Sequence, residues 1–249
     1  MIQPRHVVCV LGRWKTFNAV QRVVAAVGGE GFELDLEYSQ LEPDARMAKA
    51  FDVSRDRVSP SFREEDVKAV ASHRAVAYVL SPPLAQHASL EVSGRMLSLV
   101  AALLDEGGVA AKGESSGIAH GAKRWRELAR EQAQGDVPSR CLALLSAWVR
   151  RPLLDEERGV LHSCGMHLLG ERDIELPGDM DAREATDWID ALGHYVLAEK
   201  PSERLNAGET FRPTAEHPRR VLRVRPCDRY EDDHFFFNPY GCWNLTELR

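Results

Sequence analysis

Gly113-Glu-Ser-Ser-Gly-Ile-Ala-His-Gly-Ala-Lys-Arg-Trp125 is the stretch around which the chain is organised. It follows a short apolar run and leads into a segment, 124–131, with the composition of a helix. Gly113, Gly117 and Gly121 let the backbone turn sharply or approach another part of the molecule closely. We therefore predict a strand, a tight turn and a helix in this order, with the three glycines as its structural turn.

Residues 113–117 also fit the Gly-x-Ser-x-Gly pattern of the nucleophile elbow of serine hydrolases. In that hypothesis Ser115 is the nucleophile and His120 is a candidate base. However, no His-Gly-Gly-type oxyanion loop precedes the turn, and few parallel strands are predicted before it. We favour a turn in which Ser115 or Ser116 caps the next helix, braced by His120 and Trp125. A serine hydrolase of esterase type stays as the alternative.

The composition describes an ordinary globular protein of 249 residues, 44% hydrophobic and 28% charged. A formal net charge of -6 argues against nucleic-acid or anionic-membrane binding and is compatible with a basic protein partner. No apolar run approaches the roughly 20 residues of a membrane span. The five cysteines include no Cys-x-x-Cys pair, as expected for free thiols in a reducing compartment. We expect a cytoplasmic protein without a cofactor.

Hydrophobic periodicity before residue 113 predicts two β-α-β units. The first has a strand at 6–11, a helix at 17–27 and a strand at 32–38; the second has a strand at 75–80, a helix at 83–106 and a strand at 109–112. Two such units predict an α+β fold with a mixed sheet, a ferredoxin-like or related sandwich.

A change of composition after residues 150–152 predicts a boundary between an N-terminal α/β sandwich region, 1–150, and a smaller α+β region, 151–249, packed on it. The second region is expected to hold strands near 159–166, 173–176, 210, 221–224 and 242–245, and an amphipathic helix at 182–199. The two regions could also form one continuous domain.

The segment His162-Ser-Cys-Gly-Met-His167 contains imidazole and thiol groups that suit zinc. On a strand, however, His162 and Cys164 share one face while His167 points to the other. No fourth ligand stands at a recognisable spacing, so we predict buried histidines and no metal.

Acidic residues gather in two places that could bind a basic partner. The first is the run Tyr230, Glu231, Asp232 and Asp233, which precedes three phenylalanines. We expect Phe235 and Phe237 in the core, with the acidic run in a solvated loop.

The second place is the predicted strand at 32–38, where Glu33, Asp35 and Glu37 alternate with apolar residues. We expect the carboxylates on its outer face and Phe32, Leu34, Leu36 and Tyr38 on its inner face.

Three segments resemble an uncharacterised family of bacterial proteins: Arg74-Ala-Val-Ala-Tyr-Val-Leu-Ser81, residues 113–121, and Phe236-Phe-Asn-Pro-Tyr-Gly241. The family includes predicted immunity proteins of type VI secretion and other polymorphic toxin systems. The resemblance implies a cytoplasmic protein that binds and neutralises one cognate toxin, such as a nuclease, by blocking its active site or assembly. It brings no catalytic residues. The sequence thus favours a non-enzymatic immunity protein.

Overall fold

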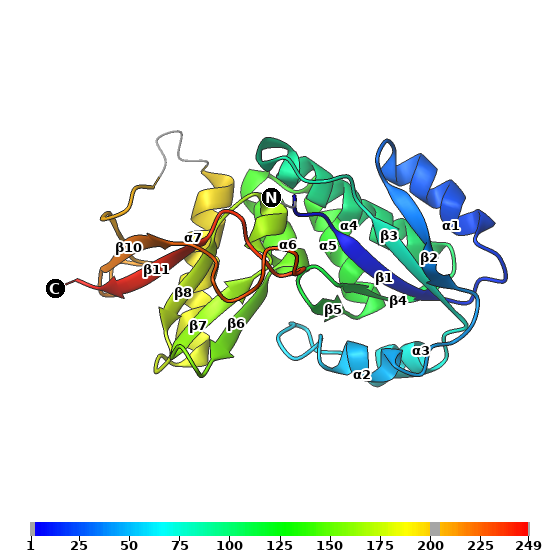
Figure 1. The fold of residues 1–249 in the computed structure, drawn as a ribbon, viewed down its shortest axis with the longest axis horizontal. Coiled ribbons are helices and arrows are strands. Elements are labelled where there is room, and N and C mark those ends of the chain that lie inside the picture. Colours follow the sequence, from blue (N-terminus) through cyan, green and yellow to red (C-terminus); the bar gives the residue numbers. More distant parts are fainter. Residues whose placement is uncertain (1–2, 200–204, 249) are drawn as a thin grey trace.

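The two predicted β-α-β units build one five-stranded sheet in the computed structural model, which describes residues 3–199 and 205–248 (Figure 1). The first unit consists of β1 (Val7–Gly12), α1 (Asn18–Val23) and β2 (Glu33–Gln40); the second consists of β3 (Ala75–Leu80), α4 (Ser89–Asp105) and β4 (Gly108–Gly113). A short strand, β5 (Ile118–His120), adds to β4.

The strand order in this sheet is β2-β3-β1-β4-β5. β3 is antiparallel to both β1 and β2, so β1 and β2 run parallel on either side of it. β1 likewise separates β3 from β4. Each β-α-β unit is therefore split by a strand of the other, which is the predicted ferredoxin-like arrangement. All neighbouring strands of this sheet are antiparallel.

Helices cover both faces of the first sheet. One face packs against α1, α4 and α5 (Ala122–Gln134) through residues such as Val8 and Val10 of β1. The opposite face, with Cys9 and Leu11, packs against α2 (Met47–Asp52) and α3 (Glu64–Ala71). Every residue of β1 is buried because helices cover both faces of the sheet. This burial explains why the sequence of β1 is continuously apolar.

A six-stranded sheet in the second half has the order β6-β7-β8-β11-β10-β9. Its strands are β6 (Arg150–Asp155), β7 (Val160–Cys164), β8 (Asp173–Pro177), β9 (Thr210–Phe211), β10 (Arg220–Arg225) and β11 (Cys242–Glu247). β8 and β11 pair in parallel, whereas the other pairs of this sheet are antiparallel. The mixed sheet of the protein is therefore this second sheet. Helix α7 (Ala182–Ala198) buries its apolar stripe against this sheet.

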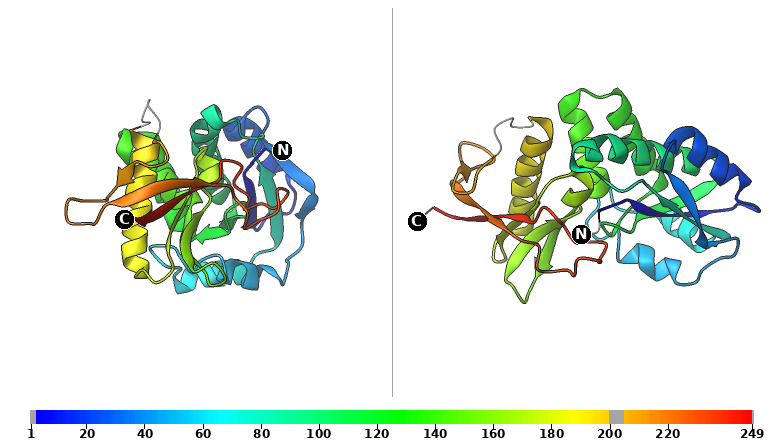
Figure 2. Two further views of the ribbon diagram at one scale, coloured as in Figure 1. Left: turned by 60° about the vertical axis from the view of Figure 1, so that its left-hand side comes forward. Right: turned by 45° about the horizontal axis from the view of Figure 1, so that its top comes forward.

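Helix α6 (Val137–Trp148) lies between the two sheets and packs against α5 on one side and α7 on the other (Figures 1 and 2). Trp148 is fully buried at the end of α6, and its ring approaches those of Trp125 and His6. One cluster of buried apolar side chains includes residues of both sheets. The change of composition at residues 150–152 coincides with the start of β6.

One predicted helix begins later in the structure than expected. The helix expected from residue 83 begins at Ser89, after a short 3-10 turn at Gln86–Ala88. At the start of α3, the carboxylate of Asp66 accepts the N–H of Arg63 at 3.0 Å. Asp66 also accepts the N–H of Ala122 at 3.2 Å, so one side chain satisfies the first turns of α3 and α5.

Candidate functional site

The turn after Gly113 connects two strands, and the prediction of a direct strand-to-helix connection was wrong. Gly113 pairs with Ile118 across an antiparallel ladder, and the N–H of Gly117 donates to the carbonyl of Gly113 at 2.9 Å. The sequence pattern missed this hairpin because β5 has only three residues. Helix α5 begins only after β5 and Gly121.

Two of the three predicted turn glycines are required by their surroundings. Gly117 has φ +66°, and a Cβ there would lie 3.1 Å from the ring of Phe236. A Cβ on Gly121 would lie 2.5 Å from a carboxylate oxygen of Asp66. A Cβ on Gly113 would lie 3.5 Å from its nearest neighbours, which is an ordinary van der Waals distance. The space around Gly113 therefore does not require a glycine.

Both hydrogen-bonding functions of the Ser115 hydroxyl are used by the backbone of the segment that leads into β1. The hydroxyl donates to the carbonyl of Arg5 at 2.7 Å and accepts the N–H of Val7 at 2.9 Å. Ser115 is 2% exposed. The prediction that Ser115 or Ser116 caps the following helix was wrong, because α5 begins after Gly121, which is its N-cap residue and has no side chain to form a cap hydrogen bond. The proton of Ser115 is not directed at a base. The neighbouring Ser116 hydroxyl is buried and has no partner among the described residues.

His120 braces the turn, as predicted, and is not paired with Ser115. Its Nε2–H donates to the carbonyl of Ser146 at 2.9 Å, and its ring meets Trp125 edge-on at 4.9 Å between centroids. Trp125 is fully buried and donates its indole N–H to the carbonyl of Ala111 at 3.0 Å. Burial lowers the pKa of His120 to about 3.

His6 and His167 occupy the buried junction between the hairpin turn and the second sheet. The hydroxyl of Ser93 donates to the carbonyl of Leu168 at 2.6 Å, so the Nε2–H of His6 donates to the Ser93 oxygen at 2.7 Å. Burial, aided by the neighbouring imidazole, lowers the pKa of His6 to about 3. Burial also lowers the pKa of His167 to about 4, although the carbonyls of Phe235 and Ser115 favour its protonated form.

Residues 226–241, between β10 and β11, form a loop that is fastened to β6, to β8 and to the turn between β6 and β7; we call it the clasped loop. Arg229 donates to Asp155 and to Glu175 at 2.8 Å each. The guanidinium of Arg158, in the turn before β7, binds the side chain of Asp228. Because Arg229 and its two carboxylates are largely buried, removing one partner would leave an uncompensated buried charge.

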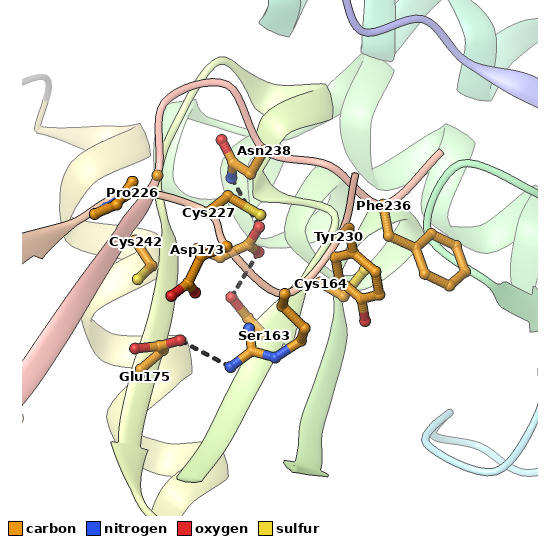
Figure 3. A pocket seen from close by; sticks show the side chains of 13 residues that line it. Ser163, Cys164, Asp173, Glu175, Pro226, Cys227, Tyr230, Phe236, Asn238 and Cys242 are labelled. Atoms are coloured by element: carbon orange, nitrogen blue, oxygen red, sulfur yellow. Dashed lines mark hydrogen bonds and ion pairs between the residues drawn. The ribbon is translucent and has the colours of Figure 1, made fainter. Parts of the chain in front are cut away.

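Asp173 fastens the other end of the clasped loop. Its carboxylate accepts from the Ser163 hydroxyl at 2.8 Å and from the Asn238 amide at 2.7 Å (Figure 3). Burial raises the pKa of Asp173 to about 6, against the opposing effect of these hydrogen bonds. The cavity beneath the loop, which Cys164 and Cys227 also line, measures about 10 Å³. Since this volume holds no more than a water molecule, the cavity is a packed junction.

The tip of the clasped loop is exposed, and the prediction of a buried Phe235 was wrong, because 58% of that residue is exposed. Phe237 is half-buried. Tyr230 stacks on His234 at 4.9 Å between ring centroids, and Phe236 meets both rings edge-on. Burial raises the pKa of Tyr230 to about 12.

The three carboxylates of the loop tip lie in the solvent, as predicted. Glu231, Asp232 and Asp233 are exposed, and they form no ion pair within residues 3–199 and 205–248. The tip therefore combines an exposed aromatic ring at Phe235 with three unpaired negative charges.

The acidic residues of β2 have three different roles. Glu33 pairs with Arg5 at 3.0 Å, and Asp35 accepts two backbone N–H groups of its own strand. Glu37 is exposed. The expected inner position of Leu36 and Tyr38 was wrong, because these residues are 59% and 66% exposed. β2 and the clasped loop belong to different sheets, so the structure does not merge the two predicted acidic sites into one cluster.

The segment at 162–167 does not assemble a zinc site. His162 lies on β7 beside Arg229 and Glu175, whereas His167 lies in a 3-10 turn beside the hairpin. Burial and the charge of Arg229 lower the pKa of His162 to about 4. In the described ranges, no group of three or more His, Cys, Asp or Glu side chains could hold a metal ion.

No helix within residues 3–199 and 205–248 is long and apolar enough to cross a membrane.

Comparison with known proteins gives no relative for this arrangement. No family model matches the chain, and neither a curated protein nor a solved structure matches it.

Proposed function

We propose that this protein is a cytoplasmic immunity protein that binds a basic toxin through the tip of the clasped loop. The observation that carries the proposal is the combination at this tip of the exposed Phe235 side chain with the exposed carboxylates of Glu231, Asp232 and Asp233, which form no ion pair among the described residues. Aromatic anchors beside charged groups are typical of protein recognition surfaces.

The base of the loop supports the proposal because it holds the tip in place before any partner arrives. Arg229 is anchored at 2.8 Å to two carboxylates, and Asn238 is anchored at 2.7 Å to Asp173. The stacked Tyr230 and His234 rings further restrict the tip. A preorganised surface loses less conformational entropy on binding than a flexible one does.

The charge of the tip indicates the chemical class of the partner. Three adjacent carboxylates attract a positively charged surface over a distance of about one Debye length and accelerate its association. A nuclease presents such a surface where it binds phosphates, and carboxylates placed there would exclude the nucleic acid. The resemblance of residues 74–81, 113–121 and 236–241 to a family that includes predicted immunity proteins points in the same direction.

The hydrolase alternative receives less support from the same geometry. Ser115 Oγ serves the backbone of Arg5 and Val7, and His120 donates to the carbonyl of Ser146. A general base must lie within hydrogen-bond reach of the proton that it abstracts. The arrangement therefore favours binding over acyl transfer.

The proposal is tested by protection of cells. The tagged protein is used to capture partners from its native host, and each captured protein is expressed in cells that lack this chain, with and without co-expression of it. We expect one captured protein to stop growth alone and to be harmless together with this chain. If none of the captured proteins is toxic in this assay, the proposal is wrong.

A substitution at the tip links protection to the proposed surface. We expect Phe235→Ser to weaken binding of the toxin by roughly tenfold or more, as for an aromatic anchor. The matched control is Leu142→Ser, which alters a 44% exposed residue of α6 and should bind like the wild type. If titration calorimetry gives equal affinities for the two variants, the tip is not part of the interface.

A further inference from the structure

Strand β2 contains a wide bulge at residues 36–39, which we call the β2 bulge. β2 pairs with β3 at Glu33–Asp35 and again at Gln40. Asp35 lies opposite Tyr78 and Gln40 lies opposite Val76, so four residues of β2 face a single residue of β3. β2 is also the edge strand of its sheet, so the bulge lies at the margin of the sheet (Figure 1).

The β2 bulge is held in shape by its own hydrogen bonds. Asp35 Oδ1 accepts the N–H groups of Glu37 at 3.0 Å and Tyr38 at 3.3 Å. The hydroxyl of Ser39 donates to the carbonyl of Asp35 at 2.5 Å and accepts the N–H of Tyr78 at 2.9 Å. Three of these contacts lie within β2, and the bond between Ser39 and Tyr78 fastens the bulge to β3, next to the ladder pairs at Asp35 and Gln40. The bulge is therefore a formed structure with a fixed shape.

The side chains that the bulge presents are apolar and exposed. Leu36 is 59% exposed, Tyr38 is 66% exposed, and Leu41 just beyond the bulge is 43% exposed. A strand with regular pairing would have turned Leu36 and Tyr38 toward one face of the sheet. Three exposed apolar residues thus lie within six positions of one edge strand, and exposed apolar side chains gathered in one place are typical of a binding surface.

The shape and charge of the bulge select among possible occupants. An added β-strand does not fit, because a bulge interrupts the regular ladder of an edge strand. A second copy of this chain would bring like charges together, because Glu37 and Glu42 are exposed and have no ion-pair partner among the residues described. A projecting apolar knob between carboxylates instead fits a concave protein surface with a basic rim.

We propose that the β2 bulge is a second recognition element, whose Tyr38 and Leu36 insert into a basic-rimmed depression on the toxin. The inference rests on the proposed function, because the occupant is the toxin that the clasped loop is proposed to bind. Tyr38 supplies a large amphipathic contact at a low cost in conformational entropy, and Leu36 packs beside it. Two separate elements would also make recognition of one toxin more specific than the acidic tip alone.

The test compares binding of the toxin identified by the protection assay to wild-type protein and to the double variant Leu36→Ser/Tyr38→Ser. We expect an affinity lower by roughly tenfold to hundredfold, as for loss of an aromatic hot spot. The melting temperature should stay unchanged, because neither side chain is buried. The control Leu154→Ser/Val224→Ser changes residues of the second sheet that are 51% and 44% exposed, and should keep full affinity.

A second variant tests the preorganisation separately. Asp35→Ala removes the acceptor of two N–H groups and leaves Leu36 and Tyr38 in the sequence. We expect a weaker complex, by roughly threefold to tenfold, because the bulge must then be ordered on binding.

The outcomes separate the two proposals. Wild-type affinity of the Leu36→Ser/Tyr38→Ser variant overturns the β2 bulge inference and leaves the clasped loop untouched. Failure of the wild type to protect against any captured protein overturns both. Protection by the wild type with loss of affinity only in the bulge and tip variants supports both.

Discussion

The hairpin turn at 113–117 and the clasped loop at 226–241 each gather reactive side chains in a short stretch, but the fold uses them differently. In the hairpin turn, Ser115 bonds to the backbone of Arg5 and Val7, and Gly117 packs against Phe236. In the clasped loop, the base is bound by buried ion pairs, while three carboxylates and Phe235 at the tip remain exposed.

This difference shows how a structural motif can be separated from a recognition motif. A polar atom that satisfies a buried backbone group contributes to stability, and its removal is felt in folding. A charged or aromatic side chain in water without a partner contributes little to stability and remains available for binding.

Acidification should produce the largest effect, through the buried histidines. His6, His120 and His167 have pKa values lowered to about 3, 3 and 4, whereas the unfolded chain protonates histidine near pH 6.5. Below pH 6.5 the unfolded state therefore binds more protons, and stability falls until the folded pKa is reached. At pH 5 each histidine should cost roughly 2 kcal/mol of unfolding free energy.

Asp173, which holds the clasped loop, opposes the loss of stability on acidification. The pKa of Asp173 is raised to about 6, so between that pH and its unfolded value near 3.8 the folded state binds the extra proton, and stability rises on acidification. Since one carboxyl opposes several histidines, we expect a net loss between pH 7.5 and 5. Urea denaturation at about pH 7.5, 6 and 5 measures it. A flat profile would mean that the histidines near the hairpin turn are accessible to protons in the folded state.

Gly117→Val should produce the next largest loss. A side chain at φ +66° costs roughly 1–3 kcal/mol in backbone strain, and crowding against Phe236 adds roughly 1–3 kcal/mol. The matched control is Gly159→Val, where φ is +61° and no atom of the described residues lies within 4 Å of the added Cβ. Thermal melts of both variants separate strain from crowding. If both lose the same stability, the contact between the hairpin turn and the clasped loop is unimportant.

Ser115→Ala should have a smaller effect, of roughly 1–3 kcal/mol, because it leaves a buried N–H of Val7 and a carbonyl of Arg5 without their partner. Ser116→Ala is the matched control, because the Ser116 hydroxyl has no partner within the described part of the chain, and should be nearly neutral. Neither variant should lose toxin binding at a temperature where it is folded. Reaction of Ser115 with a fluorophosphonate probe in the folded wild type would instead revive the hydrolase hypothesis.

The sequence predicted those parts of the fold that depend on local hydrophobic patterns. The apolar runs of β1 and β3 and the amphipathic stripe of α7 were located correctly, and the order of elements predicted a ferredoxin-like or related sandwich. The acidic tip at 231–233 was also located correctly as a solvated loop. Each of these features depends on residues that are close together in the chain.

Features that depend on distant partners were missed. The partners of Ser115 are more than 100 positions away in the chain, so no local pattern could distinguish a backbone brace from a nucleophile. The exposure of Leu36 and Tyr38 depends on hydrogen bonds of Asp35 and Ser39 that interrupt an otherwise regular alternation. Alternation alone predicts only an uninterrupted strand.

The central claim is that the unpaired carboxylates of the clasped loop recognise a basic toxin. Its most direct test is the association rate of the toxin with the triple variant Glu231→Gln/Asp232→Asn/Asp233→Asn, measured at low and physiological ionic strength. The control variant Glu30→Gln/Asp179→Asn/Asp187→Asn changes the net charge equally at exposed positions elsewhere. We predict that the loop variant associates roughly tenfold more slowly at low salt and depends less on salt, whereas the control behaves like the wild type. Equal rates and equal salt dependence for both variants would contradict the claim.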